Sequence, residues 1–143
     1  MRGSLLITGA DGFIGRPLCR KLLFQNQKIC AATRGEVPNL HNSINVGEIG
    51  AETSWWDALL GVDVVIHLAA RVHVMHDDAI DPLEEFRKVN VAGTENLARV
   101  AATSGVKRLV YVSSVKVNGE ENHSGRHYTE VDVPAPQDPY GIS

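Results

Sequence analysis

The chain has 143 residues, a formal net charge of −3, and 43% hydrophobic and 22% charged residues. A chain of this size forms one domain with a sizeable core, and its mild negative charge gives no reason to expect nucleic acid as a partner. No apolar run approaches the length of a membrane span and no secretory signal opens the chain, so we expect a cytoplasmic protein without membrane contact. Cys19 and Cys30 match no metal or redox spacing, so we expect two reduced core cysteines and no metal site.

Strand-like and helix-like segments alternate along the chain. Short apolar runs predict strands over residues 4–8, 28–33, 44–46, 63–68 and 107–113. Apolar residues at helical spacing predict helices over residues 13–25, 54–60 and 81–105. Residues 118–143 have no periodic pattern, so we expect a loop that belongs to an active site or to a region completed by further chain.

Individual residues support two of these helices. Asp81 suits an N-cap, Pro82 suits the first helical position, and Gly105 suits the position after the last turn. In the helix over residues 54–60, Trp55 and Trp56 cannot both face the core. We therefore expect one tryptophan to be buried and the other to be exposed or in contact with a partner.

The alternation of elements predicts an α/β fold. We expect a Rossmann-type parallel sheet of strand order 3-2-1-4-5 with helices on both faces. In such a sheet, ligands bind at the carboxyl ends of the strands. The last strand is expected to leave an uncovered edge over residues 109–112, where a second copy of the chain could pair to form a homodimer.

The most informative stretch joins the first strand to the first helix. Gly9, Gly12 and Gly15 follow the apolar run over residues 5–7. The first glycine permits a sharp turn, the second lets a pyrophosphate approach the backbone, and the third permits close packing of the helix against the sheet. The helix N-terminus then offers N–H groups and a partial positive charge to an anion. The pattern predicts a dinucleotide-binding domain, although its GxxGxxG spacing differs from the commoner GxGxxG.

Five motifs, including this turn, follow one another in a characteristic order. They are TGADGFIG over residues 8–15, HLAA over 67–70, VNVAGTENL over 89–97, YVSSVKVNG over 111–119 and DPYGIS over 138–143. With these motifs the chain resembles the extended short-chain dehydrogenase/reductases, in the nucleotide-sugar epimerase/dehydratase group. The runs LAARVHVMHD and SSVKVNGE look most similar to bacterial NDP-sugar epimerases or 4-keto-sugar reductases of surface-polysaccharide pathways.

The resemblance implies an enzyme that binds NAD(P) and transfers hydride at a carbon of a nucleotide sugar. It gives Tyr140 the acid/base role and Ser114 the role of holding the reacting oxygen, with Ser113 as the less favoured neighbour. Lys116 is expected to meet the sugar diphosphate. The implied cofactor-binding residues are Gly9, Asp11, Gly12, Phe13, Ile14, Gly15, Arg34, Glu48, Ile49, Leu68, Ala69, Ala70, Asn90 and Tyr140.

The sequence departs from the family pattern in three places, one of which is Asn118, where many relatives have tyrosine, so the identity of the substrate stays open. A tyrosine is a poor base at neutral pH unless a nearby cation lowers its pKa, and the family's lysine, four places after the tyrosine, would come directly after Ser143. We therefore expect residues 1–143 to be the N-terminal, NAD(P)-binding domain of a longer enzyme, with little or no turnover alone. Thr33 and Arg34 stand where users of NAD usually have an acid, which favours NADP(H), although Glu36 is an alternative partner for the ribose.

Other interpretations stay open from the sequence. The chain could be a non-catalytic NAD(P)-binding module that senses redox state, or a related reductase of a non-sugar carbonyl. Arg34 could be an ordinary surface cation, and Asn90 a mid-helix hydrogen-bonding residue with or without a ligand role. His67 is expected to be structural, and the histidines and aspartates over residues 73–78 are expected to form a solvated loop and not a metal site.

Overall fold

A computed structural model describes residues 4–35, 42–72, 80–122, 125 and 127–143. At its centre is a five-stranded sheet in the order β3-β2-β1-β4-β5, in which every neighbouring pair of strands is parallel. This confirms the predicted strand order and the Rossmann-type architecture. The strands are β1 (Ser4–Thr8), β2 (Lys28–Thr33), β3 (Ser43–Asn45), β4 (Val62–His67) and β5 (Arg108–Tyr111).

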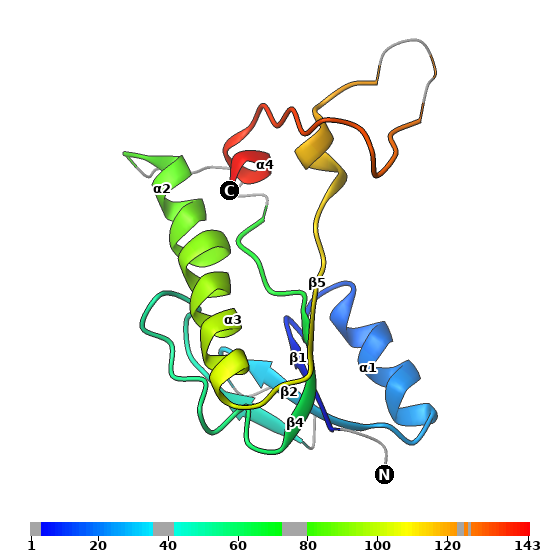
Figure 1. Ribbon diagram of the computed structural model, residues 1–143, viewed down its shortest axis with the longest axis vertical. Coiled ribbons are helices and arrows are strands. Elements are labelled where there is room, and N and C mark those ends of the chain that lie inside the picture. The colour runs from blue at the N-terminus through cyan, green and yellow to red at the C-terminus, as the bar shows by residue number, and fades with distance from the viewer. Residues whose placement is uncertain (1–3, 36–41, 73–79, 123–124, 126) are drawn as a thin grey trace.

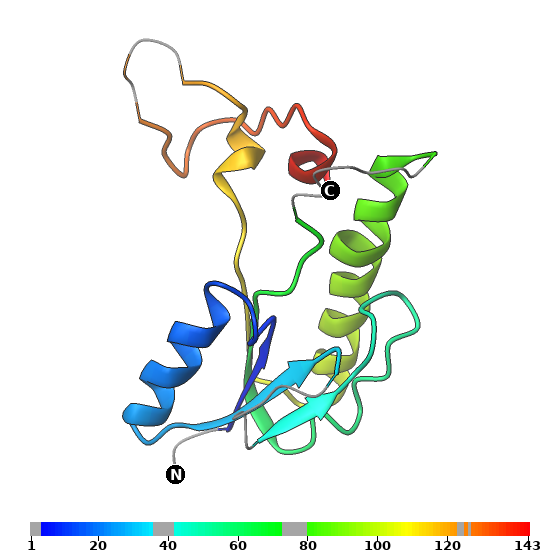
Figure 2. The same cartoon turned by 180° about the vertical axis from the view of Figure 1, so that it is seen from behind.

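Helices cover both faces of the sheet (Figures 1 and 2). Helix α1 (Gly15–Phe24) lies on one face. On the other face lies one long rod, composed of α2 (Pro82–Arg87), the π-helix η1 (Lys88–Gly93) and α3 (Thr94–Thr103). Two short helices follow β5 and lie beyond the carboxyl ends of the strands (Figure 1): the 3₁₀ helix η2 (Val115–Asn118) and α4 (Pro139–Ile142).

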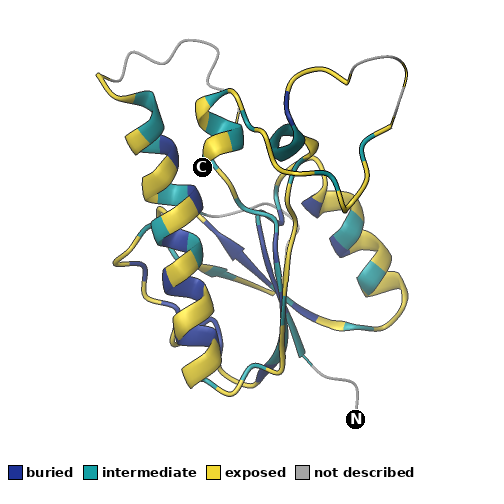
Figure 3. Cartoon of the chain, turned by 45° about the horizontal axis from the view of Figure 1, so that its top comes forward, coloured by how far each residue is buried: buried dark blue, intermediate teal, exposed yellow. Residues whose placement is uncertain are grey.

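The alternation of side chains along β1 divides the core into two clusters. Leu6 faces the rod and is buried with Trp55 and Leu97, whereas Ile7 faces α1 and is buried with Cys19. Buried residues follow the sheet and the inner sides of the helices (Figure 3). Both cysteines are unpaired thiols. The two clusters hold α1 and the rod against opposite faces of the sheet.

The prediction of a helix over residues 54–60 is wrong. The segment forms irregular turns, one of them closed by a 3.0 Å hydrogen bond from the Leu59 N–H to the Trp55 carbonyl. So short a segment gains little stability from helix formation itself, so tertiary packing decides its conformation. Trp55 is fully buried and Trp56 is 60% exposed, which confirms the expected division between the two tryptophans.

The rod follows its predicted caps. Asp81 Oδ1 accepts a 3.1 Å hydrogen bond from the Glu84 N–H, and Gly105 takes φ = +79° just beyond the last turn. The sequence pattern did not predict the π-helix at its centre, where Asn90 and Gly93 are buried. The prediction of a loop over residues 118–143 is wrong at its end, where the helix start implied by the DPYGIS motif forms α4.

The outer edge of β5 is open among the described residues. Val110, Tyr111 and Val112 are 40%, 52% and 44% exposed. The expected uncovered edge is therefore present, and a homodimer stays a prediction. Within the described ranges, no helix is long and apolar enough to cross a bilayer.

Candidate functional site

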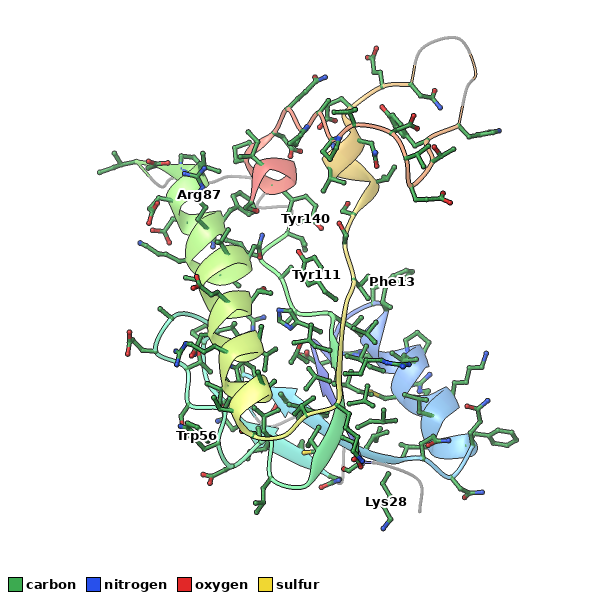
Figure 4. The ribbon with its side chains drawn as sticks, in the orientation of Figure 1. Phe13, Lys28, Trp56, Arg87, Tyr111 and Tyr140 are labelled. Carbon is green, nitrogen blue, oxygen red and sulfur yellow. The ribbon has the colours of Figure 1, made fainter. Side chains whose placement is uncertain are left out.

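Most of the predicted site residues gather at the carboxyl ends of β1, β4 and β5. Figure 4 shows Tyr140 and Tyr111 between the rod and the chain that follows β5, with Phe13 on the α1 side of that chain. Lys28 and Trp56 lie at the opposite end of the sheet. Because all strands of a parallel sheet end on the same side, the fold brings together segments that are far apart in the sequence.

The turn after β1 is closely packed at two glycines and open at the third. Gly9 has φ = +64°, and a Cβ there would lie 2.8 Å from the Ala69 nitrogen, so glycine lets the turn approach the segment after β4. A Cβ on Gly15 would lie 2.1 Å from the Gly9 carbonyl oxygen, so Gly15 permits α1 to pack closely against the turn that leaves β1. A Cβ on Gly12 would meet, among the described residues, only that same oxygen at 3.2 Å. Space is therefore left beside Gly12.

This open backbone fits a pyrophosphate. Phe13 is 96% exposed and Ile14 is 57% exposed, and within the described ranges no hydrogen bond occupies the N–H of either residue. Both groups directly precede α1, whose dipole favours an anion at this end. The Asp11 carbonyl accepts a 2.7 Å hydrogen bond from Arg16 Nε and supports the turn. The residues present thus suit the diphosphate of a dinucleotide.

A buried set of hydrogen bonds ties this turn to β4 and α3. His67 is 1% exposed; its Nδ1 lies 2.6 Å from Thr8 Oγ1 and its Nε2 lies 3.0 Å from Thr94 Oγ1. Thr8 Oγ1 also accepts from the Leu68 and Ala69 N–H groups, at 3.2 and 3.1 Å. The Thr8 hydroxyl proton therefore points to Nδ1, and the imidazole carries its proton on Nε2, which donates to Thr94. Burial lowers the pKa of His67 to about 4, so the ring is neutral and structural, as expected.

Asn90 joins three segments beside the site. Its Oδ1 accepts from the Arg71 N–H at 2.8 Å, and its Nδ2 donates to the Arg71 carbonyl at 3.1 Å and to Ser143 Oγ at 2.9 Å. Ser143 Oγ donates to the Tyr140 carbonyl at 2.8 Å. Asn90 is thus a mid-helix hydrogen-bonding residue that also links α4 to the segment after β4, so both interpretations of this residue fit its position.

Tyr140 and Ser114 line one small cavity of about 40 Å³. Ser113 lines it as well, so the cavity does not discriminate between the two serines. Ser114 Oγ accepts a 3.3 Å hydrogen bond from the Lys116 N–H at the start of η2. The remaining lining residues come from the segment after β4, the end of β5, the rod, η2 and α4: Ala69, Ala70, Asn90, Tyr111, Val112, Val117, Gly141 and Ser143. The cavity places the predicted acid/base, oxygen-holding and cofactor-wall residues together.

A second group of predicted residues lies after β2 and β3. Arg34 Nη1 and Glu48 Oε1 are 3.7 Å apart, and their side chains are 69% and 81% exposed. Ile49 lies against Gly93, where a Cβ would be 2.6 Å from Ile49 Cγ2. Glu48 also borders a cavity of about 500 Å³ between residues 46–54 and the rod. This corner places a cation and an anion close together, and their expected contacts with the adenosine end of a dinucleotide stay predictions. Glu36 lies outside the described residues.

Lys116 lies between two carboxylates. Its ammonium pairs with Glu120 and, at 3.3 Å, with Asp138 Oδ2. Its expected contact with a sugar diphosphate stays a prediction. In the described parts of the chain, no group of three or more side chains is arranged to hold a metal ion. The cluster over residues 73–78 lies outside those parts.

Three contributors to the site were not predicted from the sequence. Thr8 and Thr94 bond to the two nitrogens of His67. Gly141 lets α4 approach η2, because a Cβ there would lie 2.8 Å from the Lys116 carbonyl oxygen. A hydroxyl next to the first glycine and a glycine directly after Tyr140 were the signals available for Thr8 and Gly141.

Residues 5–143 match the sequence pattern of the NAD dependent epimerase/dehydratase family. A UDP-glucose 4-epimerase of Vibrio cholerae is 41% identical over 100% of this chain and 44% of its own length. A short-chain dehydrogenase/reductase superfamily protein of Agrobacterium tumefaciens with bound NAD has a TM-score of 0.84 at 29% identity, over 97% of this chain and 41% of its own. MoeE5 in complex with UDP-glucuronic acid and NAD has a TM-score of 0.81 at 30% identity, over 98% of this chain and 45% of its own. The chain spans less than half the length of these proteins.

Proposed function

This chain belongs to the NAD-dependent epimerase/dehydratase family, and we propose that it supplies the dinucleotide-binding part of an enzyme that acts on a nucleotide-linked sugar. The proposed reaction is hydride transfer at a sugar carbon, C4 of an NDP-hexose, with epimerisation or reduction of a 4-keto sugar as its outcome. The observation that carries the proposal is the turn after β1, where open space beside Gly12 adjoins the N-terminus of α1. UDP-glucose is the first substrate to test, because the Vibrio cholerae relative is a UDP-glucose 4-epimerase.

In this reaction Tyr140 exchanges a proton with the sugar hydroxyl or keto oxygen, and Ser114 donates a hydrogen bond to the same oxygen. Their shared cavity supports these roles. Bound nicotinamide supplies the site that accepts or returns the hydride. The family motif provides a lysine four places after the tyrosine, whose charge favours the phenolate. Since the chain spans less than half of its relatives, we assign turnover to the whole protein and expect residues 1–143 alone to show little or none.

For the cofactor we propose a preference for NADP(H). Arg34 directly follows β2, the place at which dinucleotide folds bind the adenosine ribose, and a guanidinium matches the geometry of a 2′-phosphate. Its present partner is the Glu48 carboxylate, which a 2′-phosphate would replace. Structures of relatives contain NAD, so we expect this chain to bind NAD. The further proposal is that it binds NADP(H) more tightly.

We also propose that the whole protein is cytoplasmic and acts in the synthesis of a surface polysaccharide. The support for this is the resemblance of the LAARVHVMHD and SSVKVNGE runs to enzymes of those pathways. Deletion of the coding gene, followed by analysis of the surface glycan, tests the pathway. An unchanged glycan would count against it.

Titration of NAD and NADP(H) into the 143-residue chain tests the cofactor site. Gly12→Val places a branched side chain in the space beside the turn and should weaken binding at least about tenfold, since the pyrophosphate must approach this backbone. Ala102→Val adds similar bulk at an exposed position of α3 and should leave binding unchanged. The proposal fails if the folded chain binds neither dinucleotide, or if Gly12→Val binds as tightly as the wild type.

Assay of the whole protein with UDP-glucose and related NDP-sugars tests the reaction. Tyr140→Phe should abolish turnover and weaken dinucleotide binding only slightly, because it removes one hydroxyl while the ring keeps its place beside Phe86. Turnover with non-sugar carbonyls alone would replace the proposed substrate with that of a related reductase. Binding of NAD(P) without turnover of any carbonyl would favour a non-catalytic module.

A further inference from the structure

Neither Tyr140 nor Ser114 lies on a strand, so strand pairing does not fix their positions relative to each other. Ser114 precedes η2, whereas Tyr140 lies in the four-residue helix α4, after a long connecting segment. So short a helix has no appreciable stability of its own. Its position must therefore come from contacts with its neighbours, and a group of these contacts converges on Lys116.

Lys116 contacts α4 through its backbone and its side chain. Its carbonyl oxygen would lie 2.8 Å from a Cβ on Gly141, so α4 and η2 meet at close range. Its ammonium pairs with Asp138 Oδ2 at 3.3 Å, while Asp138 Oδ1 accepts a 2.6 Å hydrogen bond from the Gly141 N–H. The same carboxylate therefore caps α4 and binds η2. Glu120 holds the ammonium as a second partner.

The charges around Lys116 suit a structural link better than a phosphate ligand. One ammonium faces the carboxylates of Glu120 and Asp138, so the three side chains together are net negative. The hydrogen bond with Glu120 raises the pKa of Lys116, and the hydrogen bond from the Gly141 N–H holds the pKa of Asp138 below its usual value. A sugar diphosphate would have to displace these carboxylates and then lie beside them.

We propose that Lys116 is a positioning residue that fastens α4 to η2 and thereby sets the separation of Tyr140 and Ser114. The importance of that separation rests on the proposed function, which gives the two side chains their roles. The link itself is a property of the folded chain and is measured without substrate.

Two substitutions of Lys116 separate its charge from its bulk, and a third removes the charge of its partner Asp138. Lys116→Met keeps the aliphatic stem and removes the charge, and Lys116→Arg keeps the charge. Asp138→Asn retains an acceptor for the Gly141 N–H but loses the ion pair. Lys107→Met is the control, because it breaks an ion pair with Asp63 at the amino ends of β4 and β5.

The probe is NMR spectroscopy of the 143-residue chain. The Tyr140 ring centroid lies 6.2 Å from that of Phe86, so its signals report whether α4 is docked. Lys116→Met should move these signals toward those of an unstructured tyrosine and speed exchange of the Gly141 amide hydrogen at least about tenfold. Asp138→Asn should do the same, and it carries the test alone if Lys116→Met does not fold. Lys116→Arg and the control should keep wild-type signals.

Three results would overturn the proposal. The first is an unchanged Tyr140 spectrum and unchanged exchange in both Lys116→Met and Asp138→Asn. The second is intact docking of α4 in Lys116→Met together with UDP-glucose binding by the whole protein that is about tenfold weaker than in the wild type. That result would make Lys116 a phosphate ligand. The third is additive effects in the double variant, which should be no worse than Lys116→Met alone, because Lys116→Met already removes the pair with Asp138. If instead the proposed function is at fault, the wild-type chain binds no dinucleotide while the Tyr140 signals still respond to Lys116→Met.

Discussion

Replacing His67 by glutamine should flatten the acid dependence of the chain's stability. Glutamine does not titrate, yet it keeps a side-chain amide that can donate to Thr94 Oγ1. In the wild-type chain, Nδ1 accepts from the Thr8 hydroxyl and Nε2 donates to Thr94, so a second ring proton would displace the Thr8 bond inside the core. Burial accordingly lowers the pKa of His67 from 6.5 to about 4 in the folded chain.

The size and sign of the effect follow from these two pKa values. Between them the unfolded chain binds more protons at His67 than the folded chain does, so stability falls as the pH falls. Lowering the pH from about 7 to about 5 should remove about 2 kcal/mol of unfolding free energy through this residue, and lowering it to about 4 should remove about 3 kcal/mol. Above about pH 7 the residue adds no pH dependence.

Urea unfolding of the wild type and His67→Gln, followed at several pH values between about 7 and 4, measures this contribution. The difference between the two free energies cancels the titration of the carboxylates that both proteins share. We expect the variant to be less stable at neutral pH and the gap to narrow by about 2 kcal/mol at about pH 5. If the unfolding free energies of the two proteins changed in parallel with pH, the reasoning would be refuted. An NMR titration of His67 in the folded chain with a midpoint near 6.5 would refute it as well.

Four further substitutions test other parts of the structure. Arg34→Ala should weaken binding of NADP(H) about tenfold relative to binding of NAD. Glu48→Gln releases Arg34 from its carboxylate partner and should strengthen binding of NADP(H) relative to NAD. Equal effects on the two dinucleotides, measured by calorimetry, would contradict the proposed preference. Gly141→Ala should displace α4, because its Cβ would lie 2.8 Å from the Lys116 carbonyl oxygen. The kcat of the whole protein should then fall with little change in the Kd for NAD. A wild-type kcat would count against this close packing of α4 on η2. Asp81→Ala should lower the free energy of unfolding by about 1 kcal/mol through loss of the N-cap, and an unchanged urea midpoint would show that the cap adds nothing.

The fold and the cofactor turn could be predicted because their signals are local. The strands are short apolar runs, and a strict alternation with helices leaves few topologies. Asp81 and Gly105 mark the ends of the rod in the sequence and in the structure. The space beside Gly12 depends on the absence of a side chain, which the spacing of the glycines shows directly.

The features that were missed depend on tertiary contacts. Residues 54–60 have the spacing of a helix, but burial of Trp55 is compatible with the turns that the chain adopts there. The bonds of His67 with Thr8 join residues on different strands, and no local pattern contains such a pair. The carboxylate partners of Lys116 are likewise brought to it by folding, in part from a distant segment, so the sequence alone led us to expect a contact with the sugar diphosphate.

The π-helix η1 makes the number of residues in the rod as important as their identity. A π-helical turn holds one residue more than the α-helical turn that it replaces, and each residue of an α-helix advances by about 100° around the axis. Deleting one codon within residues 88–93 would restore a regular helix and leave α2 facing as it does now relative to α3, because the π-helical turn holds the extra residue. Deleting Glu95 from α3 would instead rotate α2 by about 100°, and Phe86 would turn away from Tyr140 while Leu97 kept its place in the core. Comparing the two deletions would therefore separate assembly of the site from folding of the domain.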